Sequence, residues 1–192
     1  MNQPTPTVVA LAVGLALAIQ GVAAAVKTSA DFDKAFDFTQ AKTWGWNPKG
    51  AGDVIMARTP EDDAATVKPR AEPIILSAVA AEMPKRGLTL ATATPDLVLT
   101  YYLLLTVNMS RQTMGQFLPP VAAWGIPPFA PATTAINAME QGSLVLDLSA
   151  KGQVVWRGLG EAEINWTLND NQRTALLREA VQKILERYPP KK

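Results

Sequence analysis

Acidic and basic side chains carry the only candidate chemistry in this sequence. The chain contains no histidine and no cysteine. Their absence removes the commonest general base, the usual partner of a nucleophilic serine, and every thiolate ligand. The sequence therefore predicts no metal site and no cofactor site. It also predicts no covalent lipid anchor, because amino-terminal lipidation of bacterial envelope proteins needs a cysteine.

Four carboxylates near the expected strands are the candidates for acid and base catalysis: Asp96, Asp147, Glu161 and Glu163. A glycosidase-like mechanism needs two carboxyl groups that face each other about 5 to 9.5 Å apart. Glu161 and Glu163 lie two residues apart, so they share one face of a strand, which is typical of a solvated edge. The Ser-x-x-Lys spacing of some serine hydrolases is absent after residue 25. We therefore expect no enzyme, and a carboxylate-dependent enzyme is the third of three hypotheses.

Arg157 and Asp147 form the most specific charged pair of the sequence. On a strand, Trp156 and Gly158 share one face and Arg157 takes the other, where it could meet Asp147 of the preceding strand. One interpretation is a structural ion pair across two strands. The alternative is an anion site, in which Asp147 or Asp96 orients Arg157, because a planar guanidinium fits a carboxylate or a phosphate.

Residues 110–137 form a proline-rich apolar insertion with a single charge, Arg111. Proline at this density excludes a helix or a central strand. One interpretation is a flap that folds back over an open face of the sheet. The other is an exposed surface for a partner protein, a lipid or the membrane interface. The contact residues of that surface would be Phe117, Trp124, Ile126 and Phe129.

The first 25 residues predict the cellular localisation of the protein. An uncharged apolar run over residues 8–19 precedes small residues at Ala23 and Ala25, the positions that signal peptidase reads. We expect cleavage before Val26 and a mature protein in the periplasm or secreted. The alternative is an uncleaved amino-terminal membrane anchor, because residues 8–26 approach the length of a membrane-spanning helix.

Residues 26–192 are expected to fold as a single α+β domain. The 18 basic and 17 acidic residues nearly balance, which disfavours a nucleic-acid partner. Period-two alternation and turn signals predict strands over residues 26–32, 41–46, 96–110, 142–148 and 153–165. Residues 47–72 are predicted as a loop, and helices are predicted from Pro73 and over residues 169–188. The expected architecture is a mostly antiparallel sheet of roughly four to six strands with the two helices packed on one face.

Three apolar stripes are expected to fill the core of this domain. On the first helix the stripe is Ile75, Val79 and Met83, and on the second it is Leu177, Val181, Ile184, Leu185 and Tyr188. The longest strand presents Leu97, Leu99, Tyr101, Leu103, Leu105 and Val107 on one face.

Six short motifs occur in an order that is similar to a known bacterial family. They are Thr43-Trp44-Gly45-Trp46, Gly87-Leu88, Pro95-Asp96-Leu97-Val98, Gly142-Ser143-Leu144-Val145-Leu146-Asp147-Leu148, Val155-Trp156-Arg157-Gly158 and Tyr188-Pro189-Pro190. In this order they resemble the bacterial envelope family called domain of unknown function 4136. The resemblance covers nearly all of residues 26–192. It implies an exported α+β domain, often a lipoprotein, with no activity and no catalytic residues assigned.

Three functions remain open from the sequence. The first is a non-catalytic periplasmic or envelope protein that acts by binding or assembly. The second is a soluble carrier of a small apolar or lipid-like ligand, which would need an apolar cavity of about 300 Å³ or more. The third is the carboxylate-dependent enzyme, which would need a polar cleft with paired carboxylates.

Overall fold

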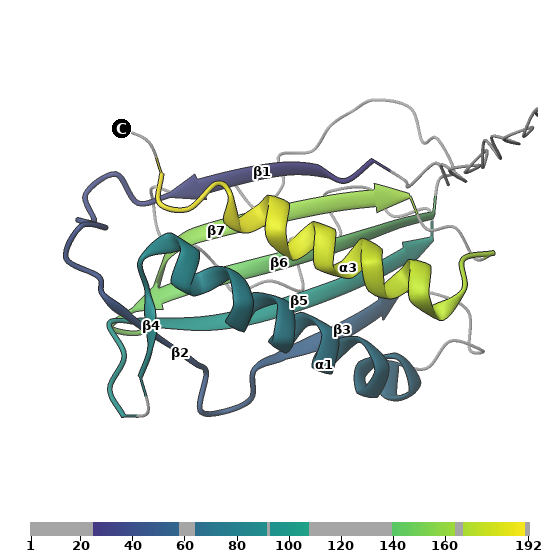
Figure 1. Ribbon diagram of the computed structural model, residues 1–192, viewed down its shortest axis with the longest axis horizontal. Helices are drawn as coiled ribbons and strands as arrows, with labels where there is room; N and C mark the ends of the chain where they lie inside the picture. Colours follow the sequence, from purple (N-terminus) through teal and green to yellow (C-terminus); the bar gives the residue numbers. More distant parts are fainter. Residues whose placement is uncertain (1–24, 58–63, 92, 108–139, 164–166, 191–192) are drawn as a thin grey trace, which may run out of the picture.

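The computed structural model describes residues 25–57, 64–91, 93–107, 140–163 and 167–190 (Figure 1). In chain order the elements are β1 (Lys27–Phe32), β2 (Thr43–Trp46), β3 (Gly52–Ala57), α1 (Ala64–Glu82), η1 (Met83–Arg86), β4 (Thr89–Leu90), β5 (Leu97–Val107), β6 (Glu140–Ala150), β7 (Gln153–Glu163) and α3 (Asp170–Leu185). None of the helices among these residues is long and apolar enough to cross a bilayer.

The strands form one mixed sheet of seven strands in the order β1-β7-β6-β5-β2-β4, with β3 also paired to β5. The long ladders β1–β7, β7–β6 and β6–β5 are antiparallel, whereas β2 and β3 run parallel to β5. The two helices cover one face of this sheet (Figure 1). The α+β class and the mostly antiparallel sheet are confirmed. The strand count exceeds the prediction because β3 and the two-residue β4 lack a sustained alternation in sequence.

A tight turn joins β6 to β7. The turn residues Lys151 and Gly152 have φ values of 51° and 80°. Positive φ at both central positions is the geometry of the two-residue hairpin turns whose twist matches that of the flanking strands. Ser149 and Ala150, expected in the connection, pair instead with Val154 and Gln153.

The predicted loop over residues 47–72 is wrong, because β3 and the first half of α1 lie there. Helix α1 begins at Ala64 and contains Pro69 and Pro73 in its interior, although Pro73 was expected in the first turn. The two prolines are four residues apart on the exposed side. Burial of Ala71, Ile75 and Val79 on the opposite side stabilises the helix beyond its intrinsic propensity.

Helix α3 follows its sequence signals closely. The Asn169 side chain accepts a hydrogen bond from the Gln172 amide, and the Gln172 side chain accepts one from the Asn169 amide. This reciprocal cap satisfies two donors that the first turn leaves without helical partners. Val181, Ile184 and Leu185 are fully buried, as predicted, whereas Leu177 is only half-buried.

The main core fills the space between the sheet and the two helices. Its largest buried side chains include Trp44, Trp156, Tyr101, Ile75, Met83 and Ile184. The glycines of β7 allow close packing here, because a Cβ atom at Gly160 would lie 2.9 Å from the Cδ1 atom of Ile184. A smaller apolar cluster of Leu104, Val145 and Leu159 lies on the other face of the sheet.

Candidate binding groove

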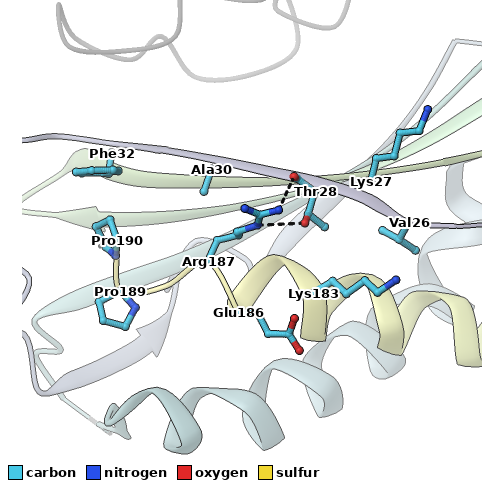
Figure 2. A pocket seen from close by; sticks show the side chains of 10 residues that line it. All are labelled: Val26, Lys27, Thr28, Ala30, Phe32, Lys183, Glu186, Arg187, Pro189 and Pro190. Atoms are coloured by element: carbon cyan, nitrogen blue, oxygen red, sulfur yellow. Dashed lines mark hydrogen bonds between the residues drawn. The ribbon is translucent and has the colours of Figure 1, made fainter. Parts of the chain in front are cut away.

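An open groove of about 870 Å³ runs between β1 and the carboxyl end of α3 (Figure 2). Strand β1 is the terminal strand of the sheet order, with β7 as its neighbour. The other wall comes from the last turn of α3 and the residues that follow it. The lining residues are Val26, Lys27, Thr28, Ala30, Phe32, Lys183, Glu186, Arg187, Pro189 and Pro190.

The buried Tyr188 side chain fixes the second wall. Its ring packs edge-to-face on Trp156, with 5.7 Å between ring centroids, and on Phe38 at 5.8 Å. Burial raises the pKa of the Tyr188 hydroxyl to about 12. The Tyr188–Pro189 peptide bond is cis. Because Tyr188 is buried in the core, the prolines after it lie along β1 and line the groove (Figure 2).

Arg187 connects the two walls. Its Nε atom donates to the Thr28 hydroxyl and its Nη2 atom donates to the Thr28 carbonyl, each over 3.3 Å (Figure 2). Lys183 and Glu186 also line the groove, and the Nζ atom of Lys183 is paired with the carboxylate of Glu179 over 2.6 Å. Lys27 borders the groove, but its side chain points away from α3 (Figure 2). Cations at this end of α3 also suit the negative end of the helix dipole.

The apolar part of the groove continues into a second hollow of about 570 Å³. The two hollows share Phe32, Pro189 and Pro190. The second is also lined by Phe36 and Phe38, whose ring centroids lie 4.8 Å apart. Together they make a continuous surface that is basic beside Arg187 and aromatic beside Phe36. A surface of this kind can hold an extended, partly apolar segment at an edge strand.

The sequence contains no local pattern that predicts this groove. Lys183 and Arg187 are four residues apart at the end of an amphipathic helix and border its buried stripe. That spacing marks a basic flank. It does not indicate that β1, at the other end of the chain, lies beside it.

Arg157 and Asp147 lie in register on β7 and β6 and form a buried ion pair. The Nε atom of Arg157 donates to Oδ1 of Asp147 over 2.7 Å, and Nη2 donates to Oδ2 over 2.6 Å. Burial raises the pKa of Asp147, while the hydrogen bonds and the charge of Arg157 act in the opposite direction. In this bidentate geometry the carboxylate of Asp147 occupies the position in which an external anion would bind Arg157. The geometry therefore favours the structural ion pair over the anion site.

Asp96 lies apart from this pair and holds the start of β2. Its Oδ2 atom accepts hydrogen bonds from the Lys42 amide and the Thr43 amide, each over 2.9 Å, and from the Thr43 hydroxyl over 2.8 Å. The Lys42 amide is the first cause of the lowered pKa of Asp96, followed by the two groups of Thr43.

The other two carboxylate candidates, Glu161 and Glu163, both lie on β7. Glu161 and Glu163 share one face of β7, with Glu161 opposite Lys27 of β1. Within the described ranges, no three acidic side chains gather closely enough to hold a metal ion. Phe117, Trp124, Ile126 and Phe129, the predicted interaction surface, fall outside the described residues.

Three solved structures illustrate what the chain is similar to. A PDZ domain protein from Parabacteroides distasonis is similar over 88% of this chain, with a TM-score of 0.51 and 16% identity. The chain spans 36% of the length of that protein. A DUF4136 family protein from Bacteroides thetaiotaomicron matches 85% of this chain and 96% of its own, with a TM-score of 0.45 and 15% identity. A PelC dodecamer from Paraburkholderia phytofirmans matches 84% and 95%, with a TM-score of 0.39 and 11% identity.

At 16% identity the likeness to the Parabacteroides distasonis protein concerns the fold alone. No curated protein sequence matches the chain. A family model described as a domain of unknown function, DUF4136, matches residues 28–190. This match covers almost all of the chain that follows the apolar amino-terminal run. The chain therefore belongs to the DUF4136 family.

Proposed function

We propose that this protein is an exported, non-catalytic envelope protein that acts by binding or assembly, and that it binds through the groove along β1. The observation that carries the proposal is the groove itself. An edge strand offers main-chain groups for pairing, and Phe32 and the prolines offer apolar surface. Arg187 and Lys183 add positive charge at the carboxyl end of α3 that can orient a partner.

The placement of the carboxylates supports a non-catalytic role. Asp147 is held by Arg157 in a buried pair. Glu161 and Glu163 lie side by side on one strand and do not face each other across a cleft. Neither arrangement matches the opposed carboxyl groups of a glycosidase-like site.

Export is proposed from the amino-terminal sequence. The apolar run and Ala23 and Ala25 support cleavage before Val26. Intact mass of the protein purified from its native envelope tests this, with a mature chain that begins near Val26 as the expected result. A species that retains residues 1–25 and fractionates with membranes would instead support the anchor.

A carrier of an apolar or lipid-like ligand is the second candidate, and the aromatic hollow favours it. That hollow exceeds the volume of about 300 Å³ that a small ligand needs. It is a surface feature, however, and side chains fill the interior between sheet and helices. Binding or assembly at the surface therefore remains the first proposal.

Site-specific photo-crosslinking in living cells separates these functions. A photoreactive residue at Lys183, inside the groove, should give a discrete protein adduct. The same residue at Arg178, on the exposed side of α3, is the matched control and should give none. Equal labelling at both positions, or none at Lys183, would contradict the proposed binding groove. A lipid adduct at Phe36 without a protein adduct at Lys183 would favour the carrier.

A further inference from the structure

The edge of β1 that faces away from β7 pairs with no other strand in the described part of the chain, and its outward-facing main-chain groups follow from the register. The Asp33 amide donates to the Val155 carbonyl of β7 over 2.8 Å, so the backbone of Asp33 faces β7. Main-chain direction alternates along an antiparallel strand, so Ser29 and Asp31 also face β7. Thr28, Ala30 and Phe32 then face away from β7. The bond from Arg187 to the Thr28 carbonyl agrees with this direction.

The charged side chains beside this edge are ordered so that two antiparallel copies of the segment would bring opposite charges together. The segment reads Lys27-Thr28-Ser29-Ala30-Asp31-Phe32-Asp33-Lys34. The Thr28 side chain turns toward Arg187 on the helix-covered side, so Lys27, Ser29 and Asp31 lie on the other side of the sheet. Positive charge stands at the start of the segment at Lys27, which lies opposite Glu161 of β7, and Asp31 and Asp33 follow before Lys34. Asp33 lies just after β1, and its Oδ1 atom accepts a hydrogen bond from the Ala35 amide over 2.8 Å.

We propose that a second copy of this chain is the partner that β1 receives, through antiparallel pairing of the two β1 strands about a two-fold axis at Ala30. This inference rests on the proposed binding role of the β1 edge and names its partner. In this register Thr28 lies opposite Phe32 of the partner subunit, and Lys27 lies opposite Asp33 of the partner subunit. The symmetry repeats each contact, so two ion pairs flank the main-chain ladder.

The mixed charge of the edge favours a second copy over an acidic peptide. An acidic strand would meet Lys27 favourably but would also meet Asp31 and Asp33, which repel it. Charged side chains on edge strands usually prevent self-association because like charges meet. Here opposite charges meet across the axis, so the same residues favour pairing.

Arg187 is compatible with this pairing. A carbonyl oxygen has two lone pairs, so the Thr28 carbonyl can accept from Arg187 and from a partner amide together. The existing bond is also long, at 3.3 Å. Arg187 and the prolines would then lie beside the joined strands and cover their helix-facing side (Figure 2).

Light scattering coupled to size exclusion tests the inference on the protein purified from its native envelope. The expected result is a dimer whose dissociation constant rises with salt, because the ion pairs are exposed. Lys27→Glu should raise the dissociation constant by at least about tenfold, and Asp33→Lys should do the same. Arg178→Glu, an equal charge change on the exposed side of α3, should leave it unchanged.

Two further experiments identify the interface. One mixes two charge variants to restore dimerisation, and the other removes a main-chain amide of β1. Lys27→Glu and Asp33→Lys proteins, each dissociated alone, should form a heterodimer when mixed, because opposite charges meet again. Ala30→Pro removes an amide that faces away from β7, so the protein should fold and lose dimerisation. Circular dichroism and a thermal melt check that each variant is folded.

A monomer at all concentrations up to about 100 µM, where a specific dimer would be populated, would overturn the inference. So would a dimer that neither Lys27→Glu nor Ala30→Pro weakens. Either result leaves the proposed function standing if Lys183 still crosslinks to another envelope protein. The proposed function is tested separately: it is contradicted if Lys183 gives no adduct, or if Lys183 and Arg178 are labelled equally.

Discussion

Replacing Arg157 with methionine tests whether the buried ion pair holds β6 and β7 together. Arg157 is 5% exposed and Asp147 is 1% exposed, and two short hydrogen bonds join them. Arg157→Met leaves the Asp147 carboxylate buried without its cation. Breaking a buried pair in this way costs about 3 to 5 kcal/mol. We therefore expect a loss of this size in the free energy of unfolding at pH 7.

The double variant Asp147→Leu, Arg157→Met is the matched control. Replacing both partners of a buried pair by apolar residues is often neutral, because neither residue then carries a buried charge. We expect the double variant to unfold within about 1 kcal/mol of the unaltered protein. Urea denaturation at pH 7, with midpoint and slope both fitted, measures each value.

Low pH should reduce the loss in the free energy of unfolding that Arg157→Met causes. Burial already raises the pKa of Asp147 above its ordinary value of 3.8, and loss of the Arg157 charge should raise it further. At pH values above the raised folded pKa, the variant carries the full cost of a buried carboxylate. Well below the ordinary value of 3.8, Asp147 is protonated in both the folded and unfolded chains, so that cost disappears.

Two results would refute this reasoning. A loss below about 1 kcal/mol for Arg157→Met would show that water or other groups solvate Asp147 in the folded protein. A double variant as unstable as the single variant would show that the site depends on shape or on other contacts of Arg157, and the charge pairing would then be secondary.

Three further predictions concern the helix-covered side of the sheet and the start of β2. Ile184→Ala should cost about 2 to 5 kcal/mol because the side chain is fully buried, whereas Arg178→Ala should cost little, so equal urea midpoints would contradict the packing of α3. Gly158→Ala should cost about 1 to 3 kcal/mol because its Cβ atom would overlap Ile184, and adding Ile184→Ala should offset part of that cost; strict additivity would count against the contact. The lowered pKa of Asp96 contributes stability above pH 3.8 that is lost as pH falls through the folded pKa. Asp96→Asn should remove that part of the acid dependence, and unchanged acid titration curves would contradict it.

Local pattern predicted the elements whose periodicity is long and uninterrupted. The alternation along β5 identified the buried face of Leu97, Leu99 and Tyr101. The stripe of Val181, Ile184 and Leu185 on α3 was visible for the same reason, because it depends on neighbours within one or two turns. Cross-strand geometry also anticipated that Arg157 would meet Asp147, since a short turn leaves little freedom of register between β6 and β7.

Elements that depend on distant contacts were missed. Pro69 indicated a loop and Pro73 indicated the first turn of a helix, yet both lie inside α1, because burial of Ile75 and Val79 against the core outweighs the helical bonds that prolines cannot make. Strand β3 exists because it pairs with β5, which lies far along the chain. Its own sequence contains too little alternation to indicate a strand.

The fold class and the family were predicted from the sequence, because short-range patterns and ordered motifs determine them, and the proposed export rests on the sequence as well. The groove came from the tertiary structure alone. Thr28 and Arg187 are 159 residues apart in the chain. They meet because β1 pairs with the last strand, β7, while burial of Tyr188 directs the end of α3 toward the same edge. A surface made by two chain ends has no local sequence signature, since only the packing of the whole sheet brings its walls together.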